Sequence, residues 1–390
     1  MKKYLLSLAV LLSATLFTAC DDKDNGKNVI SVVVTNGSYV LCAGNAWSGI
    51  DGSLTYIDYA TGISANDQFY AKNGRSLGGT PNDILVYGDK MYIAVTDENT
   101  LEIVDAKTLA SIKQIKLTDM MGADKGINPR RLCAADGLVY VSTYGGCSNT
   151  FDPETWATTT EGNGYVAAID TINFSLKDTY TVGSYPEGIA VSGSYLVVAN
   201  SDYSAVTKAS VSLVNLSSKE SKTFTDSKIT NPTAVAVTMN GAAIYVLDMG
   251  NYADVKGGIR KISSSGDVTS LFNCTNATFV GYNIYASDCS DYGANVDHFT
   301  VYNIQTGTKK DYPSGVDRFF YPNIVTADPV TGHIFVASYS EKADTPNTPD
   351  YSANGYVVEY DEYGTKLKEY ACGVGPTAIA FNMAYEEYVY

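Results

Sequence analysis

The pattern that decides the fold is clearest in Ser184-Tyr185-Pro186-Glu187-Gly188-Ile189-Ala190-Val191 and in the following Tyr195-Leu196-Val197-Val198-Ala199-Asn200. It consists of a proline, an apolar strand, a Gly-containing turn, and a second strand that ends in small residues. β-Branched and aromatic residues dominate both strands, which is typical of buried β-structure. A unit this short cannot bury its own apolar faces, so it predicts a repeat architecture.

The same start recurs along the whole chain. Its copies begin at Pro81, Pro129, Pro186, Pro232, Pro322 and Pro376, with a degenerate copy at residues 276–280. The starts are about 49 residues apart, slightly more than the roughly 40 to 45 residues of a four-stranded propeller blade. No convincing amphipathic helix interrupts the pattern. The sequence therefore predicts an all-β, seven-bladed β-propeller over residues 31–390.

The two ends of the chain are expected to meet. Pro376 is followed by room for one innermost strand but not for a full blade, whereas residues 39–70 supply strands that lack such a start. Pairing of the N- and C-terminal strands would close the ring and remove exposed strand edges.

The amino terminus has the charged, apolar and small-residue order of a secretory signal. Lys2 and Lys3 precede an apolar stretch, which is shorter than the roughly 18 residues that span a membrane. Phe17-Thr18-Ala19-Cys20 resembles a bacterial lipobox, with Phe17 where leucine is usual. That resemblance implies a signal peptide over residues 1–19 and a lipidated, palmitate-bearing Cys20. Ordinary signal cleavage is the alternative.

Asp21-Asp22-Lys23-Asp24 follows directly and resembles the acidic tag that exports lipoproteins of the Bacteroidota type to the cell surface. A solvated linker is the simpler interpretation of this run. Residues 20–30 are thus expected to be a lipid-anchored linker, and the protein is expected to lie in the outer membrane, facing the cell exterior.

Composition restricts the function. The formal net charge of −15 disfavours nucleic acid and charge-driven binding to anionic lipid, and leaves neutral or cationic partners open. The two histidines, His298 and His333, are far apart, which argues against a histidine metal cluster or a Ser-His-Asp site. Gly74-Arg75-Ser76-Leu77-Gly78 matches G-x-S-x-G but lies in a connector, so we interpret it as chance. We expect a binding protein with no cofactor and no metal, not an enzyme.

Six cysteines besides Cys20 allow fifteen disulfide pairings. An oxidising compartment makes disulfides plausible, and the preferred bridge joins Cys274 and Cys289. Cys42 lies in an apolar strand and is expected to be a small buried residue.

The ligand site is expected at the end of the ring where connections lead into the innermost strands. Loops after the second strands lie at the same end, and they are long and rich in aromatic residues, whose polar tips suit binding surfaces. Packing of the loops onto the ring is the alternative role. The candidates are Asn45, Trp47, Tyr144, Trp156, Asn200, Tyr203, Asp248, Tyr252, Asp288, Tyr292 and Tyr339 from the loops, and Arg130, Glu187 and Tyr321 from the connections.

The repeat resembles the YVTN/YncE-like propellers of bacterial surfaces. The lipobox, the acidic tag, the length and the Tyr- and Asn-rich loops further resemble the BtuG-type surface lipoproteins of Bacteroidota. That resemblance implies that one propeller face captures cobalamin (vitamin B12) or a related corrinoid and passes it to a TonB-dependent outer-membrane transporter. The alternative is an interaction module that docks a protein or glycan in a nutrient-uptake complex. A third class, a propeller hydrolase or lactonase, would need a central carboxylate cluster with calcium.

Overall fold

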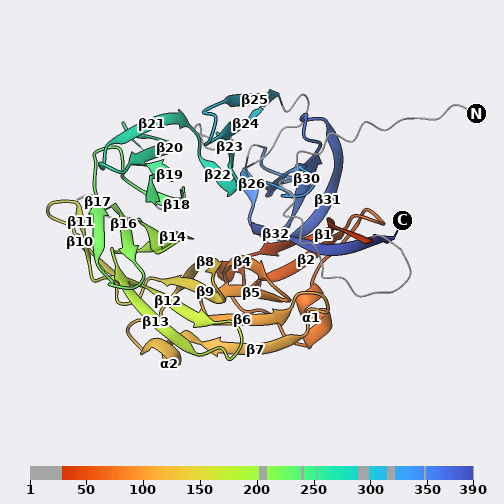
Figure 1. Cartoon of the computed structure of the whole chain (residues 1–390), viewed down its shortest axis with the longest axis horizontal. Helices are drawn as coiled ribbons and strands as arrows, with labels where there is room; N and C mark the ends of the chain where they lie inside the picture. The colour runs from red at the N-terminus through yellow and green to blue at the C-terminus, as the bar shows by residue number, and fades with distance from the viewer. Residues whose placement is uncertain are drawn as a thin grey trace, which may run out of the picture. The chain divides into compact units, whose positions relative to one another are not determined.

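A computed structural model of the chain describes residues 29–201, 209–238, 241–251, 253–288, 298–313, 321–346 and 348–389. The larger of two compact units, Val34–Ala384, carries the β-propeller, and the smaller comprises the chain ends. Seven four-stranded antiparallel sheets, the blades, form a ring in this larger unit (Figure 1). The predicted all-β, seven-bladed fold is confirmed. Along the described residues, no helix has both the length and the apolar character needed to cross a membrane.

Blades 1 to 3 follow one another along the chain, each written from its innermost strand outward. Blade 1 contains β4 (Pro81–Tyr87), β5 (Lys90–Val95), β6 (Thr100–Asp105) and β7 (Ser111–Lys116). Blade 2 contains β8 (Pro129–Ala135), β9 (Leu138–Thr143), β12 (Gly164–Asp170) and β13 (Leu176–Val182), with the hairpin β10 (Ser148–Asp152) and β11 (Ala157–Glu161) inserted after β9. Blade 3 contains β14 (Pro186–Ser192), β15 (Tyr195–Asn200), β16 (Ser210–Asn215) and β17 (Ser221–Phe224).

Blades 4 to 6 repeat this order. Blade 4 contains β18 (Pro232–Val237), β19 (Ala243–Gly250), β20 (Lys256–Ser263) and β21 (Val268–Asn273). Blade 5 contains β22 (Asn276–Val280), β23 (Asn283–Ser287), β24 (His298–Asn303) and β25 (Lys309–Pro313). Blade 6 contains β26 (Pro322–Ala327), β27 (Ile334–Ser338), β30 (Asn354–Tyr360) and β31 (Lys366–Val374), with the short hairpin β28 (Ser340–Glu341) and β29 (Pro349–Asp350).

Blade 7 joins the two ends of the chain, as predicted. It contains β32 (Pro376–Val389), β1 (Val29–Cys42), β2 (Ser53–Asp58) and β3 (Ile63–Ala65), in that order from the inside. Figure 1 shows the C-terminal β32 beside the N-terminal β1. Short helices lie in the connections, among them η1 (Ala46–Ser48), α1 (Gln68–Asn73) and α2 (Leu117–Met121).

Among the described residues, the core consists of seven apolar clusters, one between each pair of neighbouring blades. The second strands are buried on both faces. In β5, for example, every residue from Met91 to Val95 is buried. This is why the second strands appear in the sequence as continuous apolar runs instead of alternating ones.

Side chains also link neighbouring blades through the backbone at the inner ends of the strands. In each of five junctions a hydroxyl or amide donates to a carbonyl oxygen of the next innermost strand. The pairs are Thr96 Oγ1 with Pro129 O (2.7 Å), Ser142 Oγ with Glu187 O (2.9 Å), Asn276 Nδ2 with Pro322 O (2.6 Å), Asn323 Nδ2 with Pro376 O (3.2 Å) and Thr377 Oγ1 with Pro81 O (3.3 Å). These bonds fix six of the seven strand starts, those of blades 5, 6, 7, 1, 2 and 3, relative to one another.

The starts share an unusual backbone. The residue before the proline has a left-handed φ in five blades: Thr80 (51°), Asn128 (51°), Tyr185 (51°), Tyr321 (60°) and Gly375 (66°). For the β-branched Thr80 such a φ costs of order 1 kcal/mol. The strand register then shifts directly after the proline in blades 1, 2, 3, 4 and 6. Such a bulge re-aims the side chains that follow it.

Candidate functional site

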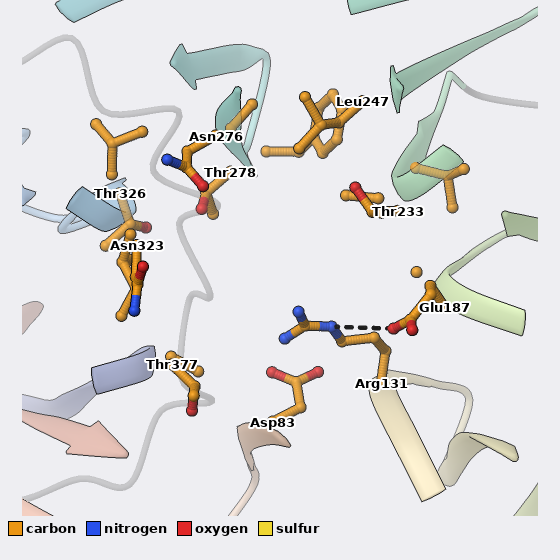
Figure 2. Close-up of a pocket in the computed structure, with 18 of the residues that line it drawn as sticks. Asp83, Arg131, Glu187, Thr233, Leu247, Asn276, Thr278, Asn323, Thr326 and Thr377 are labelled. Carbon is orange, nitrogen blue, oxygen red and sulfur yellow. Dashed lines mark ion pairs between the residues drawn. The ribbon is translucent and has the colours of Figure 1, made fainter. Parts of the chain in front are cut away.

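A cavity of about 530 Å³, the central cavity, lies where the innermost strands begin, and all seven blades line it (Figure 2). Its labelled polar residues are Asp83, Arg131, Glu187, Thr233, Asn276, Thr278, Asn323, Thr326 and Thr377. The volume is within the roughly 300 to 1,000 Å³ of ordinary ligand pockets.

The repeat itself builds this lining. Arg130, Glu187, Thr233, Asn323 and Thr377 each follow the proline of their own blade, and all of them line the cavity. Each of these five blades thus presents one polar residue to the cavity. A left-handed residue precedes the proline in blades 2, 3, 6 and 7, and a register shift follows it in blades 2, 3, 4 and 6. Because the fold repeats this position, chemistry at the cavity can change without changing the blades.

Four charged residues lie on one side of the cavity. Arg130 binds Glu187 in the next blade, with 3.0 Å between Nη2 and Oε1 and 3.1 Å between Nε and Oε1. Arg131 Nε lies 4.0 Å from Glu187 Oε2, and Arg131 Nη1 donates to the Asn82 carbonyl at 2.9 Å. Burial would raise the pKa of Glu187, but Arg130 and Arg131 outweigh it and hold that pKa below its ordinary value. Glu187 therefore stays ionised although it is buried.

Asp83 faces Arg131 across the wall of the cavity (Figure 2). Its Oδ2 accepts a hydrogen bond from Leu132 N at 2.8 Å, and its Oδ1 accepts one from Ile84 N at 3.0 Å. Burial nevertheless dominates and raises the pKa of the Asp83 carboxyl, against the opposing effect of Arg131. A carboxyl with a raised pKa in a concave site marks a functional candidate.

The predicted residue Tyr144 extends the site outward from Glu187. Its hydroxyl donates to Glu187 Oε1, and the Arg130 guanidinium lies over its ring at 5.0 Å from the centroid. Tyr185 packs edge-on against the same ring. The structure thus brings together three of the predicted candidates, Arg130, Tyr144 and Glu187.

A second group of predicted residues gathers beside the start of β32. Tyr339 packs edge-on against Tyr351, with ring centroids 4.9 Å apart, and Asn45 Nδ2 donates to the Tyr351 carbonyl at 2.9 Å. Burial, then Tyr321 and Tyr339, raise the pKa of the Tyr351 hydroxyl. A Cβ placed on Gly375 would lie 3.5 Å from Tyr339 Oη, so this tyrosine cluster adjoins the strand that carries Thr377 into the cavity.

Asn200 and Asp248 are fully buried and bind their own blades. Asn200 Nδ2 donates to Ser210 and Ser212 at 3.1 and 2.9 Å. Asp248 accepts from Thr230 N (2.8 Å), Thr230 Oγ1 (3.0 Å), Asn231 N (3.0 Å) and Gly250 N (2.8 Å). Asp248 therefore holds the connection that places Asn231 at the cavity. Asp288 is half-buried and lines a separate cavity of about 190 Å³ with Cys274 and Lys309.

The two tryptophans lie elsewhere. Trp47 is fully exposed in η1, and Trp156 is exposed in the β10–β11 hairpin, where it packs against Phe151. Neither is among the described residues that line the central cavity. Figure 1 shows the hairpin at the outer side of the ring, away from the innermost strands.

Several predictions fall outside the described residues. These are the candidates Tyr203, Tyr252 and Tyr292, the lipidation site Cys20, and Cys289 of the preferred disulfide. Within the described ranges, no group of three or more His, Cys, Asp or Glu side chains is placed to hold a metal ion.

Sequence reasoning missed Asp83, Arg131, Thr233, Asn276, Asn323 and Thr377, which all line the cavity. The signal that could have found most of them is their fixed offset of one or two residues from the repeat proline. The search favoured long loops, whereas the cavity is lined mainly by strand starts.

The fold and the site define a β-propeller with a polar cavity lined by all of its blades. No family model matches the sequence, and no curated protein matches it. Solved structures do match. A provisionally assigned 6-phosphogluconolactonase from Bacteroides uniformis has a TM-score of 0.56 at 12% identity, over 89% of this chain and 100% of its own. Another from Bacteroides fragilis has a TM-score of 0.53 at 12% identity, over 89% of this chain and 98% of its own. At this identity the likeness shows the fold alone.

Proposed function

We propose that the protein is a non-catalytic binding protein that captures an amide-rich small molecule, a corrinoid such as cobalamin, at the central cavity. The observation that carries this proposal is that all seven blades line one polar cavity. Both the corrinoid and its transfer to a TonB-dependent transporter come from the sequence resemblance, as does the lipid anchor at the cell surface.

The hydrogen-bonding groups of the cavity suit a neutral ligand. Asn276 and Asn323 offer side-chain amides, and Thr233 and Thr278 offer hydroxyls, which are groups that can donate and accept. Thr377 donates its proton to the Pro81 carbonyl and offers its oxygen as an acceptor. A corrinoid carries amides around its periphery, so such groups can pair with it in either direction. The two arginines are matched by two carboxyl groups, so the local charge is close to balanced although the chain carries −15.

The cavity would hold part of a ligand this broad, and the neighbouring aromatic residues supply further surface. Tyr144 lies beside Arg130 and Glu187, and Tyr339 lies beside Gly375. Tyrosine gives a large contact area at a small entropic cost and keeps a polar tip for hydrogen bonding. The proposed site is therefore the central cavity together with these tyrosines.

Calorimetric titration of the chain from residue 21 onward with cyanocobalamin tests the proposal. We expect one-to-one binding that is abolished by Thr233→Trp, because an indole on β18 fills the cavity. Thr269→Trp is the matched control, because Thr269 lies exposed on β21 of the same blade. The affinity of this variant for cyanocobalamin should stay within about twofold of that of the unaltered protein. Absence of heat with the unaltered protein at high micromolar ligand would contradict corrinoid binding. Equal binding by both variants would place the site elsewhere.

Asp83 favours a second candidate function, hydrolysis of a lactone. A carboxyl with a raised pKa suits proton donation in the same cavity, and the similar solved structures carry provisional lactonase names. Turnover of a sugar lactone that is lost in Asp83→Asn, with the fold intact by circular dichroism, would favour this function over simple binding.

The exposed Trp47 and Trp156 favour docking of a protein or glycan as a further alternative. Double substitution of both by alanine should leave corrinoid binding unchanged under the main proposal. If the chain binds no corrinoid, loss of binding to a glycan array in this double variant would support the docking function.

A further inference from the structure

Cys42 and Cys372 lie close together where blade 7 packs against blade 6. Cys42 is the last residue of β1, and Cys372 lies near the end of β31. Both side chains are fully buried in the apolar cluster shared by these two blades. The backbone beside them is tied across the same junction, since Ala43 N donates to Gly375 O at 2.7 Å and Gly44 N donates to Val374 O at 2.9 Å.

The two side chains lie close together, and both are free thiols in the structure. The proximity of Cys42, together with burial, raises the pKa of the Cys372 thiol well above its ordinary value. A Cβ placed on Gly373 would lie only 3.2 Å from both Cβ and Sγ of Cys42, which shows how closely β31 approaches the end of β1.

An irregularity in blade 6 favours this approach. The register between β30 and β31 shifts between Asn354 and Tyr356, so that Cys372 and Gly373 together oppose Gly355. Such a bulge turns the side chains of the longer strand out of their regular alternation. A Cβ on Gly355 would lie 3.3 Å from Cys372 Sγ, so glycine leaves room for the sulfur there.

We propose that Cys42 and Cys372 form a disulfide bond that links β1 of blade 7 to β31 of blade 6. The bond is expected when the chain folds in an oxidising compartment, which the signal-like amino terminus predicts. It is distinct from the predicted bridge between Cys274 and Cys289, and it is independent of the ligand of the central cavity.

The chemistry is an ordinary thiol–disulfide exchange. Two S–H bonds break and one S–S bond forms, while the two electrons and two protons pass to the disulfide of an exchange partner, which is reduced to two thiols. The thiolate is the attacking species, and burial suppresses it in the closed ring. The bond must therefore form while the chain folds, before the packing of blade 7 on blade 6 shields the thiols from the exchange partner.

Peptide mapping of the full chain, secreted into an oxidising compartment, tests the bond. The protein is denatured with iodoacetamide and no reductant, then digested and analysed by mass spectrometry. We expect one linked species that contains Cys42 and Cys372. Cys133, which lies on β8 in blade 2, should be alkylated and serves as the internal control. Full alkylation of Cys42 and Cys372 in the secreted protein would overturn the proposal.

Thermal unfolding with and without reductant gives a second readout. The midpoint of the unaltered protein and of Cys133→Ser should fall by several degrees when reductant is added. The fall should be clearly smaller in Cys42→Ser, because one reducible bond is already missing. Equal falls in Cys42→Ser and Cys133→Ser would show that no such bond supports the fold. Since each variant is compared with itself, a direct effect of the serine on the core does not confuse the result.

Discussion

Arg130 on blade 2 and Glu187 on blade 3 form an ion pair across the wall of the central cavity, with 3.0 Å between Nη2 and Oε1. The Glu187 side chain is only 4% exposed, whereas that of Arg130 is 19% exposed. Most of the cost of removing water therefore falls on the carboxylate, and the two arginines with Tyr144 compensate it.

Glu187→Gln should lower the free energy of unfolding by roughly 3 kcal/mol, because it leaves the two arginines without their shared partner. Urea unfolding at neutral pH measures this change. Asp89→Asn is the control, since it removes the exposed ion pair with Lys90 and should cost less than about 1 kcal/mol. Equal losses of unfolding free energy in the two variants would mean that the buried ion pair stabilises the protein no more than the exposed one.

Asp248→Ala should destabilise the protein by about 3 kcal/mol, because it removes the acceptor of three backbone N–H groups and one hydroxyl. It should also weaken ligand binding, since Asp248 holds the connection that bears Asn231. Asp267→Ala, in an exposed turn of the same blade, should cost under about 1 kcal/mol. Unfolding and titration of both variants separate the two effects, and a neutral Asp248→Ala would refute this role.

His333 makes stability depend on pH near neutrality. Its Nδ1 lies 2.7 Å from Glu359 Oε1, and Tyr370 donates to Glu359 Oε2 at 2.6 Å. The bond with Glu359 outweighs burial and raises the pKa of His333 above its ordinary 6.5. Burial would raise the pKa of Glu359, but the bonds from His333 and Tyr370 lower it below 4.5.

The directions of these two pKa shifts define the pH range in which the pair stabilises the fold. The stabilisation from His333 is fully present below pH 6.5 and is lost as the pH rises through its raised pKa. The stabilisation from Glu359 is present above pH 4.5 and is lost as the pH falls through its lowered pKa. We expect the free energy of unfolding to fall as the pH rises from about 6.5 through the raised pKa of His333, and we expect His333→Gln to flatten this fall. A slope that the variant leaves unchanged would assign the pH dependence to other groups.

The C-terminal strand should be required for folding. A chain that ends at Gly375 lacks β32 and leaves β1 with an open edge, so we expect it to aggregate or stay unfolded. A chain that ends at Ala384 keeps the part of β32 that belongs to the propeller unit, and it should give a near-normal circular dichroism spectrum and unfolding midpoint. Cooperative unfolding of the shorter chain would show that six blades suffice.

The blades could be predicted because six of the seven starts combine a proline, which cannot donate to the strand ladder, with an apolar run that must be covered. Residues at the ends of the second strands were harder to place. Asn200 ends β15 and Asp248 lies inside β19, so both belong to the sheet and not to the loops that the sequence suggested. Strand ends cannot be located to the residue from composition, and one step along a strand reverses the face of a side chain.

The cavity was predicted only in part for a related reason. Arg130 and Glu187 follow their prolines directly, whereas Asp83 and Arg131 lie one position further. The bulge brings both positions to the cavity, and no residue type announces that bulge in the sequence. Trp156 stood out by composition, but the β10–β11 hairpin carries it outward, which is a tertiary effect that local sequence does not encode.

The place of β32 in blade 7 also sets the order in which the ring can be assembled. β32 follows every other strand of the ring in the sequence, so six blades can form while β1 still waits for its inner neighbour. Throughout that interval the folding chain exposes an unpaired β1 edge that strands of other chains could join. The lifetime of this open ring, more than the stability of the closed one, would then determine the yield of folded protein.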